Sequence, residues 1–203
     1  MYKINKIVFF SFFVFLFCSC NGQMGTNATN CNKKFKEARN LVFTYPAASR
    51  QTALDSALNL ANECLLCDSI KKAVIDFKIT LLIAMKKYAE GINFVSSLSD
   101  SDFSFGFKKK ITLEGIQALV YGSKNDTINR NLTYKEMASY LERYLQLQHI
   151  SDNEFKEIYT YLFAIRENYL DSVSINKEVD SLQKVYPAKE SFFEFFRKHQ
   201  QSQ

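Results

Sequence analysis

Residues 73–85, AVIDFKITLLIAM, are apolar on nearly every side of a helix, with only three polar residues among them. Such a helix must be covered by neighbours on several sides, so it belongs at the centre of a domain. We expect it to run from a cap at Asp68-Ser69 to about Lys87, with a shorter partner helix at 88–98. This stretch therefore predicts a domain built from helical hairpins.

Apolar residues at helical spacing predict further helices on both sides of this centre. The expected helices lie at 32–45 (ended by Pro46), 49–66, 112–121, 133–148, 151–170, 175–185 and 187–198. Two prolines and six glycines in 203 residues also favour long helices with few turns. We assign the chain to the all-α class, with about eight or nine helices in antiparallel hairpins that form an irregular α-solenoid or bundle.

Local signals predict where several of these helices begin and end. Thr133-x-x-Glu136 and Ser151-x-x-Glu154 are capping boxes, each expected to open a helix. Pro187 suits the first turn of the last helix. Gly122 is expected to end the helix at 112–121 in a left-handed conformation.

One hairpin resembles a known repeat. Within 73–98, four residues stand at the second-helix spacing of the tetratricopeptide repeat: Tyr88, Gly91, Val95 and Leu98. Ile79 replaces the small residue of the motif's first helix, and the other hairpins do not keep the repeat's period of about 34 residues. The resemblance implies a surface that binds a protein or peptide.

Two groups of phenylalanines are candidate partner-binding residues. In SDSDFSFGFKKK (99–110), Phe103, Phe105 and Phe107 alternate with small residues, a period typical of an extended segment. We expect either a loop that packs its rings onto the helices or an apolar flap that contacts a partner. The last helix carries rings on more than one side, so one pair should face the core and the other is a candidate interaction patch: Phe192, Phe193, Phe195 and Phe196.

Three cysteines of the helical region are disulfide candidates. Cys64-x-x-Cys67 closes a predicted helix, whereas a redox motif of this spacing opens a helix after a strand. If the first two helices turn near Pro46, Cys31 lies beside the end of the second helix. We therefore predict a Cys31–Cys64 or Cys31–Cys67 bond with the remaining thiol buried, which an oxidising compartment permits.

Residues 1–20, MYKINKIVFFSFFVFLFCSC, predict export. Two lysines precede an apolar run at 7–17, which is too short to span a membrane and is typical of a secretory signal. The segment Phe17–Cys20 resembles the lipobox of bacterial lipoproteins. This resemblance implies that Cys20 receives a diacylglycerol thioether and becomes the mature N-terminus. Cys18 as the modified residue, an ordinary cleaved signal and an uncleaved membrane helix are the alternatives.

The predicted organisation is a signal peptide at 1–19, a flexible tether at 20–30 and a single all-α domain at 31–203. The predicted location is the outer membrane, where the lipid anchor holds the domain on the periplasmic or cell-surface face.

The sequence does not indicate catalytic chemistry. His149 and His199 have no ligand neighbours at metal-binding spacing, and no phosphate-binding loop or nucleophile elbow occurs. The net charge of +5 is scattered, which argues against nucleic acid, and the basic runs at 33–36 and 108–110 are interpreted as solvated helix starts. We predict no metal, no cofactor and no enzymatic activity.

The favoured function is that of a membrane-anchored, non-catalytic module that binds a protein or peptide of unknown identity. The alternative is an immunity protein that neutralises a delivered toxin, and an enzyme is less favoured.

A short triplet, Asp-Ser/Thr-apolar, recurs at 55–57, 68–70, 126–128, 171–173 and 180–182, each time with an aliphatic third residue. It resembles the acceptor motif for O-glycosylation of exported proteins in some Gram-negative bacteria. This resemblance implies modified hydroxyls, of which Thr127, in an expected loop, is the most accessible. Asp-Ser also starts helices, so helix capping is the alternative interpretation.

Overall fold

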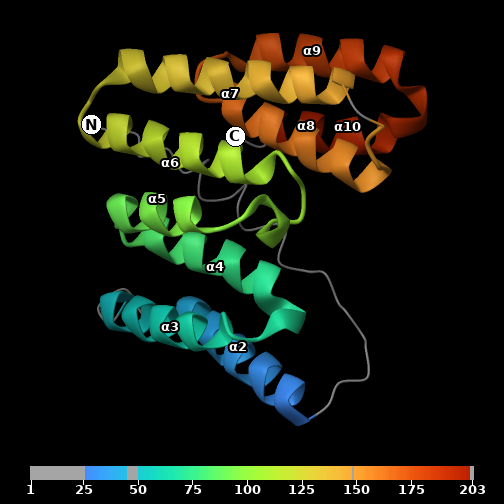
Figure 1. Cartoon of the computed structure of the whole chain (residues 1–203). Coiled ribbons are helices and arrows are strands. Elements are labelled where there is room, and N and C mark those ends of the chain that lie inside the picture. The colour runs from blue at the N-terminus through green and yellow to red at the C-terminus, as the bar shows by residue number, and fades with distance from the viewer. Residues whose placement is uncertain (1–25, 45–49, 148, 202–203) are drawn as a thin grey trace. The chain divides into compact units, whose positions relative to one another are not determined.

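The computed structural model describes residues 26–44, 50–147 and 149–201. These residues form α-helices joined by turns and three short 3₁₀ segments, and contain no β-strand, so the all-α prediction is confirmed. The nine helices of the described part are labelled in Figure 1: α2 (Thr26–Thr44), α3 (Arg50–Cys64), α4 (Lys71–Ala84), α5 (Tyr88–Ser97), α6 (Lys108–Ser123), α7 (Thr127–Leu147), α8 (Asp152–Arg166), α9 (Ser172–Val185) and α10 (Glu190–Gln201).

The helices fall into two compact units, one reaching Val120 and the other beginning at Tyr121, and each is described by itself. The predicted signal peptide, Cys20 and the first part of the predicted tether lie outside the described residues. α2 begins at Thr26, so residues 26–30 of the predicted tether are helical. The sequence TNATN has no apolar periodicity, but extending an existing helix costs far less than starting one.

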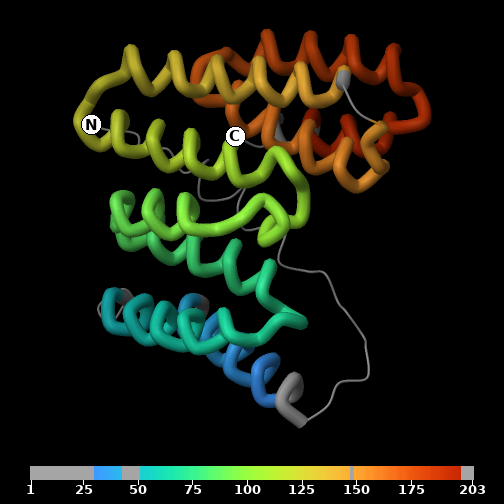
Figure 2. The backbone as a smooth tube through the Cα atoms, viewed as in Figure 1, coloured from blue at the N-terminus to red at the C-terminus, as the bar shows by residue number. Residues whose placement is uncertain are grey.

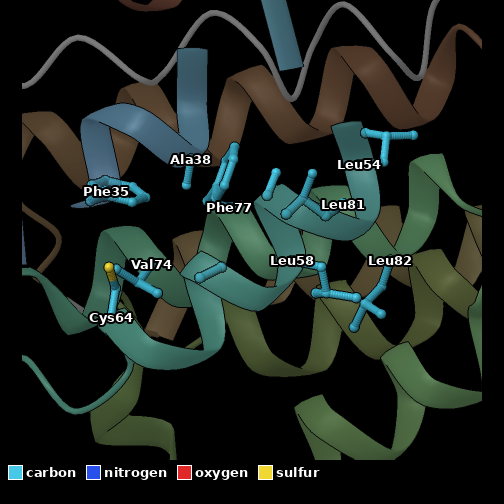
Figure 3. Close-up of a cluster of buried hydrophobic side chains, with 11 residues drawn as sticks. Phe35, Ala38, Leu54, Leu58, Cys64, Val74, Phe77, Leu81 and Leu82 are labelled. Carbon is cyan, nitrogen blue, oxygen red and sulfur yellow. The ribbon is translucent and has the colours of Figure 1, made fainter. Parts of the chain in front are cut away.

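In the first unit along the chain, α2 and α3 pack against each other, and α3 packs against α4. Figure 3 shows their shared core, in which the rings of Phe35 and Phe77 meet edge to face at 5.5 Å. Ala38, Ala57 and Ala61 are completely buried, and their small side chains let the helix backbones approach closely. The core is filled by Phe35, Ala38, Leu54, Ala57, Leu58, Ala61, Cys64, Val74, Phe77, Leu81 and Leu82.

α4 is the central helix that its sequence predicts, because its side chains enter two separate cores. Phe77 and Leu81 pack toward α2 and α3, whereas Ile75 and Ile79 pack with Val95 of α5 and with α6. The expected Asp68 cap is wrong, since residues 68–70 form a 3₁₀ turn without a side-chain cap at either helix start.

Among the described residues of this unit, Gly91 is a glycine whose lack of a side chain permits a close helix approach. A Cβ atom added there would lie 3.3 Å from Ile116 Cδ1 of α6 and 3.9 Å from Leu82 Cβ of α4. A larger residue would therefore push α5 away from both neighbours.

The turn after α6 is closed by an asparagine, not by Gly122 as expected. Asn125 adopts a left-handed conformation with φ of 59°, and the Asp126 amide donates to the Tyr121 carbonyl at 2.9 Å. This is the bond of a Schellman cap, in which asparagine is the usual substitute for glycine.

In the second unit, one of the two predicted capping boxes supplies a helix cap and the other does not. Ser151 begins α8 as predicted, because its hydroxyl accepts the Glu154 amide at 3.2 Å. The box at Thr133 is wrong, since α7 already begins at Thr127 and the Thr133 hydroxyl donates to the Asn129 carbonyl inside the helix. Asp126 caps α7 instead, accepting the Asn129 amide at 3.1 Å.

Within this unit, α7 packs against α8, and α9 packs against α10. Figure 2 traces the backbone through these helices. Apolar side chains of all four helices are buried: Tyr134, Met137, Ala138, Leu141, Phe155, Ile158, Tyr159, Leu162, Phe163, Ile165, Ile175, Val179, Phe193 and Phe196. Among the described helices, none is long and apolar enough to cross a membrane.

Candidate functional site

The phenylalanines of the loop before α6 belong mainly to the core. Phe103 is 3% exposed and packs with the α4–α5–α6 core, and Phe107 is completely buried. Phe105 is half-buried, with its ring stacked on that of Phe107 at 5.8 Å. Of the two expectations, the loop that packs its rings onto the helices therefore describes Phe103 and Phe107, and neither ring is available to a partner in this structure.

Lysines from two helices hold this loop in place. Lys72 of α4 donates to the Phe103 carbonyl at 2.9 Å, and Lys109 of α6 donates to the Leu98 carbonyl. Lys108 is only 8% exposed and lies 3.8 Å from Asp76. The interpretation of 108–110 as a solvated helix start is therefore wrong for its first two residues, because the loop carbonyls and a carboxylate attract them inward.

Asp102 adds a charged contact between the same loop and α4. It forms an ion pair with Lys71 at 2.8 Å and accepts hydrogen bonds from the Ser99 amide and hydroxyl, each at 2.9 Å. The Lys71 contact, followed by the two bonds from Ser99, lowers the pKa of Asp102 to about 2. These bonds favour the ionised carboxylate and fix the start of the loop.

The phenylalanines of α10 divide between the core and the surface. Phe193 is completely buried and Phe196 is 8% exposed, which makes them the core-facing pair. Phe195 is 58% exposed, and Phe192 is half-buried. Only Phe195 offers most of its ring to solvent.

The exposed ring of Phe195 rests on a continuous group of aromatic side chains. It contacts Phe196 at 5.6 Å between ring centroids, and Phe196 contacts Phe163 of α8 at 4.6 Å. Phe193 packs edge to face on Tyr159 at 5.5 Å. Burial, followed by the contact with Tyr186, raises the pKa of Tyr159.

One ion pair and two side-chain hydrogen bonds fix α10 and α9 to each other. Arg197 of α10 forms an ion pair with Asp180 of α9 and donates to the Gln183 side chain at 2.6 Å. Gln183 in turn donates to Glu194 at 3.0 Å. The backbone that carries Phe195 is thus held by both apolar and polar contacts.

The structure decides between the two predicted disulfide pairings. Cys31 of α2 and Cys67, just after α3, form the disulfide, with Cα atoms 6.2 Å apart. Cys64 is the buried free thiol, and its sulfur lies 3.8 Å from the Cys31 carbonyl oxygen. Burial raises the pKa of the Cys64 thiol. The bond therefore links α2 to the chain just after α3, and the remaining thiol fills space in the core.

Other candidate residues add no chemistry to these sites. His149 is exposed, while the side chain of His199 and the whole of Cys20 lie outside the described residues. No group of three or more metal-ligating side chains occurs in the part of the chain that the structure describes.

Comparison with known proteins gives no relative from which a role could be transferred. No protein-family model, curated protein or solved structure matches this chain.

Proposed function

We propose that this protein is an exported lipoprotein, anchored in the outer membrane through Cys20, that binds a protein or peptide without catalysing a reaction. The signal at 1–20 supports the export and the anchor. The observation that carries the binding function is Phe195, which is 58% exposed on a helix where Phe193 and Phe196 are buried.

An exposed ring on a rigid support is well suited to protein recognition. Burying a phenylalanine side chain contributes about 1.5–3 kcal/mol, and binding energy is concentrated in a few such anchors. Because Phe196 and the ion pair of Arg197 already fix this part of α10, little conformational entropy is lost on binding.

The surroundings of Phe195 suggest what the partner presents. Ser191, one turn earlier, is exposed, and Glu194 is partly exposed beside it. A central apolar anchor with a polar rim is the usual anatomy of a protein interface. The partner should therefore offer an apolar pocket or an aliphatic peptide side chain to the ring.

The binding surface can be tested by photocrosslinking in native membranes. Phe195 is replaced by p-benzoyl-L-phenylalanine, which keeps an aromatic ring in place. The matched control carries the same residue at Leu66, which is 88% exposed in the other unit. A discrete adduct at position 195 that is absent at position 66 supports the proposal. Equal labelling at both positions, or none at 195, refutes it.

The anchor is tested separately by the mass of the N-terminal peptide. A peptide that begins at Cys20 and carries acyl chains supports it, and Cys20→Ser should release the protein from membranes. A chain that keeps Met1 and carries no lipid refutes it.

A further inference from the structure

The triplet Asp-Ser/Thr-aliphatic is far more frequent than composition explains. The 203 residues include nine aspartates, 27 serines and threonines, and 56 alanines, valines, isoleucines and leucines. Random order would give about 0.3 such triplets, whereas five occur. Helix capping accounts for an aspartate at a helix start but does not require an aliphatic residue two positions later.

The structure separates these five triplets into two groups. In 55–57 the aliphatic residue, Ala57, is completely buried within α3, and in 68–70 and 180–182 it is half-buried. In the other two triplets the aliphatic residue projects into solvent, since Ile128 is 80% exposed and Val173 is 60% exposed. The packing of the fold gives no reason for an aliphatic residue at either position.

The two exposed triplets also share one local geometry. Thr127 and Ser172 are both exposed and are the first residues of α7 and α9. Each follows an aspartate that caps its helix, with the Asp171 carboxylate accepting the Ser174 amide at 2.7 Å. At a helix start the residues before the hydroxyl lie outside the helix, whereas Ser56, although exposed, has helical backbone on both sides and is followed by buried Ala57.

We propose that Thr127 and Ser172 are O-glycosylated, and that a transferase recognises the aspartate and the exposed aliphatic residue on either side of each hydroxyl. This proposal rests on the export proposed above. The other three triplets stay unmodified in the folded protein because their aliphatic residue is engaged in packing.

The transfer requires a glycosyl donor activated by a phosphate leaving group, such as a lipid-linked sugar pyrophosphate. The hydroxyl oxygen of Thr127 or Ser172 forms a bond to the anomeric carbon of the sugar, and the bond from that carbon to the donor phosphate breaks. The hydroxyl proton leaves through a base of the transferase, and the released phosphate carries away the bonding electrons. No oxidant or reductant takes part.

The test is site mapping of the protein purified from membranes of its source organism, with fragmentation that preserves labile side-chain groups. We expect sugar masses on the peptides that contain Thr127 and Ser172, and an unmodified peptide around Ser56. Thr127→Ala should remove one glycan, and Ser56→Ala should change nothing.

Two further variants separate recognition from folding. Asp126→Asn keeps an effective helix cap but removes the carboxylate, and Ile128→Glu replaces the exposed aliphatic side chain while leaving the hydroxyl in place. Each should lower the occupancy of Thr127 at least tenfold and leave Ser172 unchanged. Unaltered occupancy in both variants would overturn the recognition argument.

The same peptide mapping distinguishes a failure of the glycosylation proposal from a failure of the proposed export and anchoring. A lipid-bearing Cys20 peptide together with bare Thr127 and Ser172 overturns the glycosylation proposal alone, as does phosphate in place of sugar or equal modification at Ser56. A chain that retains Met1 overturns the export proposal and, with it, this one.

Discussion

The disulfide between Cys31 and Cys67 should supply a large part of the stability of its unit. The two cysteines are 36 positions apart, so the bond closes a loop of about 37 residues. In the chain-entropy model, closing such a loop reduces the entropy of the unfolded chain enough to stabilise the native state by about 3.8 kcal/mol at 25 °C. Whole small domains are stable by only about 5–15 kcal/mol, so removing the bond should be plainly visible.

The appropriate variant is Cys31→Ser, measured by urea unfolding with and without a reducing agent. Changing Cys67 instead would leave Cys31 beside the buried Cys64, whose sulfur lies 3.8 Å from the Cys31 carbonyl oxygen, and a new bond between them would mask the loss. The free energy of unfolding should fall by about 3–4 kcal/mol relative to the oxidised wild type. The urea dependence should steepen, because the unfolded chain without the bond is less compact.

Two comparisons make this prediction refutable. In reducing agent, wild type and Cys31→Ser should have nearly equal stability, because both then lack the bond. Cys64→Ala, which keeps the bond but leaves a small cavity, should cost clearly less than Cys31→Ser. A loss below about 1 kcal/mol for Cys31→Ser, or a loss that persists under reduction, would show that loop closure is not the cause.

Three further perturbations test the packing and the electrostatics. Phe193→Ala should cost about 3–5 kcal/mol in urea unfolding, because its completely buried ring leaves a cavity, whereas Phe195→Ala should change stability by less than about 0.5 kcal/mol. Gly91→Leu should lower the free energy of unfolding by about 1–3 kcal/mol, since even a Cβ would lie 3.3 Å from Ile116. Gly122→Ala should be neutral or stabilising, because its Cβ would lie 3.5 Å from the flexible Arg130 side chain. The pKa of Asp102 is depressed to about 2, so its ionised carboxylate stabilises the fold above pH 4 and this stabilisation is lost as the pH falls toward 2. The difference in urea midpoint between wild type and Asp102→Asn should therefore shrink over that pH range. A constant difference would contradict the assignment.

The fold was predictable where local signals and burial agree. The largely apolar stretch of α4 indicated a helix covered on several sides, and Ile75 and Phe77 do enter two different cores. Ser151 was correctly placed at the start of α8 because its box directly precedes an apolar run. Thr133-x-x-Glu136 matches the same motif, but the helix already begins after Asp126, which caps it seven residues earlier.

The candidate sites were less predictable because they depend on contacts between distant segments. The exposure of Phe195 and the burial of Phe193 follow from where α8 lies, which the α10 sequence alone does not specify. We interpreted the lysines at 108–109 as solvated, because the neighbouring sequence does not indicate that a loop carbonyl and the Asp76 carboxylate would contact them. The cysteines were predictable to two pairings only, because one helical turn separates Cys64 from Cys67.

Phe195 differs from Ile128 and Val173, the exposed aliphatic residues of the two triplets, and this difference argues for two different uses. Phe195 is supported from behind by Phe196 and the aromatic core, an arrangement that gives a rigid anchor for a lasting complex. Ile128 and Val173 instead project into solvent beside an exposed hydroxyl residue at the start of a helix, and exposed Leu132 lies one turn after Ile128. A single unsupported aliphatic side chain contributes too little for stable binding, but it suffices to place a neighbouring hydroxyl in an enzyme's active site for one turnover. If Phe195→Ala abolishes partner binding and leaves the glycans intact while Ile128→Glu does the reverse, the two surfaces are independent.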